Sequence, residues 1–171
     1  MVRIQVKHGA DKEFIYDCEI TYQLEEIASE VLHISNLQYK IDRLLLKLEP
    51  LLSPLRGNPK IIPLIRALSG AKVYASKDQV LNNKAVSFYV MRDHVQAVEG
   101  LVMENYQLLG FEDSNQVQKL LTDVEVLHEE TTHLLWAGKE LAKGKRLCDY
   151  IGMNDKTKIV LRLQPPNSCS A

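Results

Sequence analysis

The stretch that decides the fold is LLWAGKELAKGKRLCDYIGMNDKTKIVLRL, residues 134–163. It opens with an apolar run that ends at Gly138, and it closes with KIVLRL, which has the apolar, β-branched composition of a strand. AKGK is typical of a turn, and DYIGMNDKT is typical of a loop that Asp149 and Tyr150 anchor by side-chain to backbone hydrogen bonds. The stretch therefore predicts two strands of one sheet, and the last strand is expected to lie in the middle of that sheet.

The first residues of the chain predict more of the same sheet. Apolar and polar residues alternate from Val2 to Val6, which is the period of a strand with one buried face. FIYDCEI follows the turn residues HGADKE and predicts a second strand, so the chain is expected to open with a β-hairpin. Leu24, Ile27 and Val31 then recur at helical spacing, which predicts an amphipathic helix directly after the hairpin.

The middle of the chain predicts helices separated by breaks. After about residue 35 the pattern changes, and a second helix is expected at residues 39–48, followed by a connector that contains several prolines. Two further helices are expected to end at Gly70 and Gly100, with LVMENY as a short strand after Gly100. Asp113 or Ser114 is expected to cap a last helix.

The bulk composition limits the classes of function. The chain has 171 residues, of which 46% are hydrophobic and 25% charged, as in soluble globular proteins. Its 21 basic and 22 acidic side chains give a formal net charge of -1, which supplies no field to attract nucleic acid. No apolar run reaches the roughly 20 residues of a membrane helix. The start MVRIQVKHG differs from a secretion signal, so a cytoplasmic protein is expected.

No motif in the sequence predicts catalysis. HEETTH, residues 128–133, places its histidines five positions apart, whereas the zinc-protease helix needs four, so a solvated helix end is favoured over a metal site. Cys18, Cys148 and Cys169 include no CxxC pair, which favours reduced thiols over a disulfide framework. We therefore expect no catalytic residue, no metal, no cofactor and no enzymatic activity.

Residues 134–163 resemble the second half of ubiquitin, in which an apolar strand, AGK, a tight turn, L-x-DY and a final VLRL strand follow in this order. The opening hairpin and helix are what a β-grasp fold requires before that segment. The resemblance implies an α+β fold with a ubiquitin-like β-grasp sheet and a mainly helical insertion. The split β-grasp domain would comprise residues 1–35 and 132–164, with the insertion at 36–131 and a short C-terminal tail at 165–171.

A second resemblance covers nearly the whole chain. MVRIQVKHG, the LEE of residues 24–26, KDQV at 77–80, VMRDHV around Met91, and LWAGKEL with DYIGMNDKTKIVLRLQ resemble the Kurly, or cilia- and flagella-associated protein 298, family in the same order. Family members continue past the last strand into a long charged tail, whereas this sequence stops at Ala171.

The second resemblance implies a non-enzymatic adaptor for motile cilia or flagella, similar to the cytoplasmic proteins that pre-assemble axonemal dynein arms. The protein would act in the cytoplasm and at the cilium or its base. A structural component of the axoneme is the alternative. The partners implied are dynein-arm assembly factors, chaperones or axonemal proteins, with no nucleic acid and no membrane insertion.

The predicted partner-binding residues are Leu135, Lys139, Lys143 and Arg146. In ubiquitin-like domains the residue at the Leu135 position helps to form an exposed apolar patch, and Lys139 is expected beside it. The sequence leaves open whether the insertion covers this face and makes Leu135 part of the core. Lys143 and Arg146 belong to a basic turn that is either solvated or a docking patch for an acidic partner. Trp136 is expected on the opposite side from Leu135, in the core.

Overall fold

The computed structural model describes residues 1–9, 11–122, 126–128 and 131–164. Its contacts divide the chain into two compact units. The first unit contains Met1–Asn36, Ser76–Phe88 and the described residues from Leu127 onward. The second contains Leu37–Ala75 and Tyr89–Val126.

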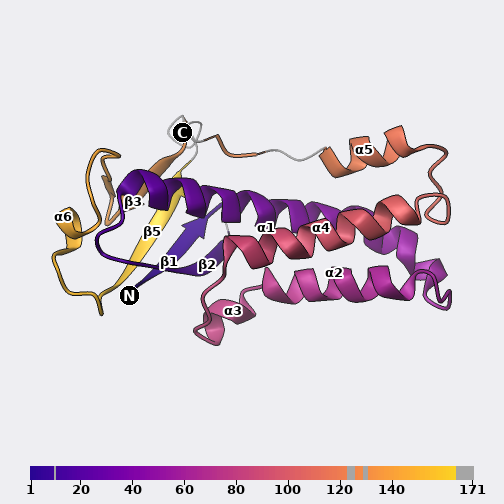
Figure 1. Ribbon diagram of the computed structural model, residues 1–171, viewed down its shortest axis with the longest axis horizontal. Helices are drawn as coiled ribbons and strands as arrows, with labels where there is room; N and C mark the ends of the chain where they lie inside the picture. Colours follow the sequence, from indigo (N-terminus) through magenta and orange to yellow (C-terminus); the bar gives the residue numbers. More distant parts are fainter. Residues whose placement is uncertain (10, 123–125, 129–130, 165–171) are drawn as a thin grey trace. The chain divides into compact units, whose positions relative to one another are not determined.

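The first unit is built on a mixed five-stranded sheet in the order β2-β1-β5-β3-β4 (Figure 1). The strands are β1 (Val2–His8), β2 (Lys12–Cys18), β3 (His133–Trp136), β4 (Lys139–Glu140) and β5 (Lys158–Gln164). β1 is antiparallel to β2 and parallel to β5, and β3 is antiparallel to both β4 and β5. The predicted hairpin, the central last strand and the α+β class are confirmed, and the ubiquitin-like identity of the sheet stays a prediction.

One face of this sheet packs against the first half of α1 (Leu24–Leu52). Every second side chain of β1 and β5 is buried on that face, as the alternation in the sequence predicts. Two polar contacts connect the sheet with α1. The buried side chains of His8 and Ser35 share a hydrogen bond of 2.8 Å between Nδ1 and Oγ, and the Tyr16 hydroxyl donates to the Glu30 carboxylate. The other face of the sheet, which α1 does not cover, is its outer side.

The helix α1 is a single helix of 29 residues, and the prediction of a break near residue 35 was wrong. Its buried positions continue at spacings of three and four residues across that point, from Ile34 through Gln38 and Ile41 to Leu48. No glycine or proline interrupts the helix before Pro50, in its last turn. The helix therefore starts in the first unit and continues in the second.

The second unit is helical. It contains the second half of α1, the short 3₁₀ turn η1 (Ser53–Leu55), α2 (Ile62–Tyr74), most of α4 (Phe88–Glu104) and α5 (Ser114–Thr122). The predictions that helices end at Gly70 and Gly100, and that LVMENY is a strand, were wrong. A glycine inside a helix costs about 1 kcal/mol, and the buried faces of α2 and α4 continue past both glycines. The predicted cap of α5 is confirmed, because Asp113 Oδ1 accepts the Gln116 N–H at 3.0 Å.

The segment Ser76–Phe88, for most of which the sequence pattern is ambiguous, packs with the sheet. It includes the short helix α3 (Asp78–Leu81), and the Val86 N–H donates to the Ile15 carbonyl of β2 at 2.8 Å.

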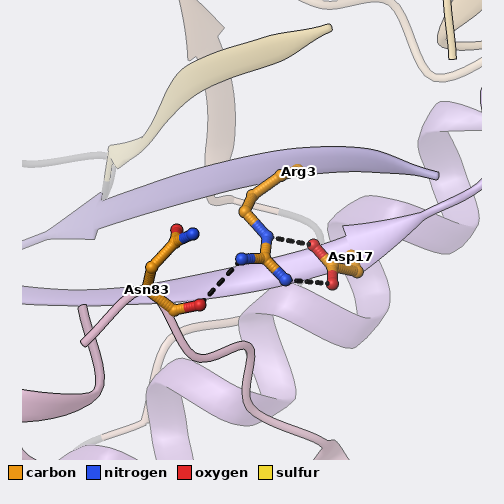
Figure 2. A network of polar contacts seen from close by, with 3 residues as sticks. All are labelled: Arg3, Asp17 and Asn83. Atoms are coloured by element: carbon orange, nitrogen blue, oxygen red, sulfur yellow. Dashed lines mark hydrogen bonds and ion pairs between the residues drawn. The ribbon is translucent and has the colours of Figure 1, made fainter. Parts of the chain in front are cut away.

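Figure 2 shows a second link between this segment and the sheet, made by Arg3. The Arg3 guanidinium donates from Nε and Nη2 to the two oxygens of Asp17, at 2.9 and 2.8 Å, and from Nη1 to the Asn83 carbonyl at 2.7 Å. A planar guanidinium fixes both partners at once. The segment thus belongs with the sheet, and the predicted limits 1–35 and 132–164 of the split domain stay a prediction.

Candidate protein-binding face

The side of the sheet opposite α1 carries Leu135, the first of the predicted site residues. Side chains alternate along β3, so Leu134 is buried in the core while Leu135 lies on the outer side and is half-buried. In the antiparallel register Leu135 lies opposite Arg162 of β5. The structure therefore places Leu135 at the sheet surface with part of its side chain accessible.

Five of the residues on this side form what we call the outer face: Leu135, Lys7 of β1, and Lys158, Val160 and Arg162 of β5. Two carboxylates also lie on this side, Glu13 opposite Lys7 and Glu140 opposite Leu135. Arg162 lies opposite both Leu135 and Lys7 in the register, and the three β5 residues follow one another at two-residue spacing. The Val160 side chain is 48% exposed. The outer face thus has an apolar centre, Leu135 and Val160, between cationic side chains.

The cations of the outer face are not neutralised by the sheet. Within the described ranges no carboxylate forms an ion pair with Lys7, Lys158 or Arg162. Arg3 is different, because Asp17 neutralises it and this contact raises the pKa of the guanidinium. An apolar surface bordered by unpaired positive charge matches a protein partner with an apolar anchor and acidic neighbours. The positive charge is local, since the whole chain has a formal net charge of -1.

The structure does not bring Lys139 onto the outer face. The register of the β3–β4 hairpin places Lys139 opposite Trp136 and Glu140 opposite Leu135. Residues that pair across two strands share a side of the sheet, so Lys139 lies on the core side of the ladder and Glu140 on the outer side. Glu140 forms an ion pair with His133.

Trp136 lies on the same side of β3 as Leu134, opposite Leu135, as predicted. It is half-buried and does not belong to the fully buried core. The hairpin next to it turns through Ala137 and Gly138, whose φ angles are 50° and 81°. Two positive φ angles are the geometry of a two-residue hairpin turn that matches the twist of the strands.

Lys143 and Arg146 are exposed in the loop that joins β4 to α6 (Cys148–Ile151). This loop is hydrogen-bonded to the segment that leads into α1, because the Leu24 N–H donates to the Lys145 carbonyl at 2.9 Å and the Leu147 N–H to the Tyr22 carbonyl at 3.0 Å. Because α1 packs on the opposite side of the sheet, these bonds hold Lys143 and Arg146 away from the outer face.

Asp149 and Tyr150 were predicted to anchor the loop DYIGMNDKT, but their side chains bond to the turn that precedes them. Asp149 Oδ2 accepts the Arg146 N–H at 2.9 Å, and the Tyr150 hydroxyl accepts the Ala142 N–H at 2.9 Å. Both side chains therefore hold the backbone of the basic turn.

Sequence reasoning missed three outer-face residues of β5. It interpreted KIVLRL as a strand that is apolar because it is central, placed Lys158 with the loop that leads into this strand, and assigned no role to Val160 or Arg162. The signal was present in the alternation of these residues with Ile159, Leu161 and Leu163, which are all buried. Lys7 alternates in the same way along β1.

Two ionisable groups of the first unit have pKa values well above their ordinary range. Burial raises the pKa of the Cys18 thiol to about 12, which keeps it protonated and a poor nucleophile. Burial and the hydrogen bond to Glu30 raise the pKa of the Tyr16 hydroxyl. No group of three His, Cys, Asp or Glu residues with the geometry of a metal site occurs in the described part of the chain. Glu129 and Glu130 of HEETTH, and Cys169, lie outside it.

The absence of enzymatic activity and of a cofactor stays a prediction. As to membranes, none of the helices formed by the described residues combines the length and the apolar character needed to cross a bilayer.

The family model and the curated proteins that match this chain carry the same name. The family model described as "Cilia- and flagella-associated protein 298" matches residues 132–170. Curated proteins of that name match almost the whole chain: the relative from Danio rerio is 24% identical, that from Homo sapiens 25% and that from Drosophila melanogaster 21%. The first two matches cover 96% of this chain and 76% of the relative, and the third covers 95% and 76%.

The Danio rerio alignment extends over 221 residues, which is more than the 171 residues of this chain, so the relative contains additional residues within the aligned region. No solved structure matches. The match to the family model and the curated relatives confirm the resemblance recognised in the motifs: along nearly its whole length the chain is similar to proteins named cilia- and flagella-associated protein 298.

Proposed function

We propose that the protein is a non-enzymatic adaptor for motile cilia or flagella, which works in the cytoplasm in the pre-assembly of axonemal dynein arms. The names of the relatives support the association with cilia and flagella. The resemblance described above implies the finer role in dynein-arm assembly.

The observation that carries the adaptor role is the outer face. Leu135 and Val160 provide accessible apolar surface, and Lys7, Lys158 and Arg162 provide positive charge that no described carboxylate pairs with. A protein partner would bury the apolar centre and place acidic side chains at the edge, where they would set orientation and association rate. Lys139, Lys143 and Arg146 would contact a partner only at the periphery of this surface or beyond it.

The cytoplasmic site of action is tested by fractionation of the ciliated cells that produce the protein. The soluble cytoplasm and detergent-extracted axonemes are compared for content of the protein, and axonemes from cells that lack the protein are compared with normal axonemes for dynein heavy chains. The proposal expects the protein in the soluble fraction and a loss of dynein arms in its absence. Retention of the protein in extracted axonemes would support a structural axonemal component instead, and normal dynein content in its absence would refute the assembly role.

The outer face is tested in the same cells with two matched variants. Val160→Asp puts a negative charge at the centre of the outer face. Met153→Asp makes the same kind of change at an exposed apolar residue, 72% accessible, in the loop before β5. We expect Val160→Asp to fail to restore dynein arms and Met153→Asp to restore them. Equal rescue by both variants would remove the outer face from the proposal.

A further inference from the structure

The second unit contains a groove that the ciliary role does not explain. It lies between the last turns of α1 and the helix α2 and has a volume of about 510 Å³. The two helices form a hairpin, because only residues 53–61 connect them and because Gln38 Nε2 donates to the Ala75 carbonyl at 3.2 Å at the other end. We call this the α1–α2 groove.

The floor of the α1–α2 groove is apolar and follows one side of each helix. Leu45 and Leu52 line it from α1 at a spacing of seven residues, and Ile62 and Ile65 line it from α2 at a spacing of three. Leu52 is buried, whereas the Ile62 side chain is 38% exposed, which is unusual for an isoleucine next to a helix interface. The groove therefore presents apolar surface that the protein itself leaves accessible.

The rim of the groove is positive. Arg56 and Arg66 line it and are exposed, and neither forms an ion pair within the residues that the structure describes. Lys72 also lines the groove, and its charge is shared with Glu49 of α1 at 3.8 Å. Two cations therefore remain unbalanced beside an apolar floor. That combination is complementary to an acidic, amphipathic segment of a partner.

The length of the groove fits a helical segment. From Ile62 to Lys72 the groove follows α2 for ten residues, which is about 15 Å at the rise of an α-helix. A partner helix with apolar residues at i, i+4 and i+7 occupies about 11 Å of such a groove. Its acidic side chains would then flank the apolar stripe on both sides, within reach of the two arginines.

We propose that the α1–α2 groove binds an acidic amphipathic helix of a partner protein, with apolar side chains on the floor and carboxylates paired with Arg56 and Arg66. This interaction goes beyond the proposed adaptor function, because it uses a different unit of the chain from the outer face and does not depend on a role in cilia.

The test is a binding titration of the full chain with two synthetic peptides. Both are amphipathic helices of about 15 residues with leucine at i, i+4 and i+7. One carries glutamate and the other lysine at the flanking positions. Fluorescence anisotropy is measured at low and at physiological salt. We expect the acidic peptide to bind at least about tenfold more tightly than the basic peptide at low salt, and the difference to shrink as salt rises.

Two double variants with the same net charge locate the interaction. Arg56→Glu with Arg66→Glu reverses the rim, and Lys77→Glu with Lys119→Glu reverses two exposed lysines that do not line the groove. The rim variant should weaken the acidic peptide by at least about tenfold, while the control variant should bind it as the wild type does. The amide NMR signals that shift on binding should come from Leu45–Arg56 and Ile62–Lys72.

Four results of the peptide experiments would overturn the proposal. They are the absence of saturable binding of the acidic peptide, equal binding of both peptides, wild-type binding by the rim variant, and shifted signals outside the groove. Sedimentation of the free chain provides a further check. A dimer that the rim variant dissociates would show that the groove is filled by a second copy of the chain, and would also overturn the proposal.

Discussion

Leu161 and Val160 are neighbours on the central strand β5, yet substitutions at the two positions should have very different effects. The Leu161 side chain is fully buried under α1, whereas 48% of Val160 is exposed on the outer face. Leu161→Ala removes buried methyl groups and leaves a cavity, which costs about 2–5 kcal/mol. Val160→Ala changes a surface position and should alter the free energy of unfolding by about 0.5 kcal/mol or less.

Trp136 makes the measurement specific to the first unit. It is the only tryptophan in the sequence and lies on β3, which pairs with β5, so its fluorescence reports unfolding of the sheet. In urea titrations we expect Leu161→Ala to unfold at a clearly lower midpoint. In thermal unfolding it should lose roughly 10 °C, given about 2–4 °C per kcal/mol for a chain of this size. If Val160→Ala were as damaging as Leu161→Ala, the register of β5 would be shifted by one residue and the outer face would be wrongly assigned.

Three further predictions follow from single contacts. Ala137→Asn should raise the free energy of unfolding by about 0.5–1 kcal/mol, because asparagine tolerates the positive φ of this turn better than alanine does. A lower urea midpoint for this variant would contradict the turn geometry. Arg3→Ala should lower the free energy of unfolding by about 1–2 kcal/mol. Arg3→Lys should recover only part of this loss, since lysine cannot bond both oxygens of Asp17 in the way that arginine does. Full recovery by Arg3→Lys would refute the bidentate contact. Between pH 8 and 10 the unfolded chain loses the Cys18 proton, whose ordinary pKa is 9.0, while the folded chain keeps it up to a pKa of about 12. Stability should therefore fall by about 1 kcal/mol as pH rises, and Cys18→Ala should reduce this pH dependence if burial of the thiol is its cause.

Local patterns predicted the sheet well because each strand carries its own signal. The alternation from Val2 to Val6, the stop at Gly138 and the run KIVLRL all depend on neighbouring residues, and all three gave the observed strands. Side-chain to backbone bonds of Asp149 and Tyr150 were predictable for the same reason, although these bonds hold the basic turn before the two residues and not the loop after them.

The helical part was predicted less well because tertiary packing overrides local helix breakers. Gly70 and Gly100 are weak stop signals, and burial of α2 and α4 against their own unit outweighs the cost of each glycine. The continuity of α1 was missed because a change in composition near residue 35 was given more weight than the unbroken three-and-four spacing of its buried positions.

The candidate site required the register of the sheet. Leu135 was recognised from the sequence, but Lys139 follows a two-residue turn whose register places it on the other side of the ladder. Lys7 and Arg162 are far apart in the chain and meet only because β1 and β5 pair in parallel. A pairing between the two ends of the chain cannot be read from any local pattern.

The most direct measurement of the central claim is quantitative affinity purification of the tagged protein from ciliated cells, with wild type, Val160→Asp and Met153→Asp compared at equal abundance. Circular dichroism of the purified variants establishes that each is folded. If the outer face binds the partner, Val160→Asp loses the proteins that wild type and Met153→Asp both retain, dynein-arm assembly factors or chaperones among them. Recovery of the same proteins, in the same amounts, with folded Val160→Asp would contradict the account.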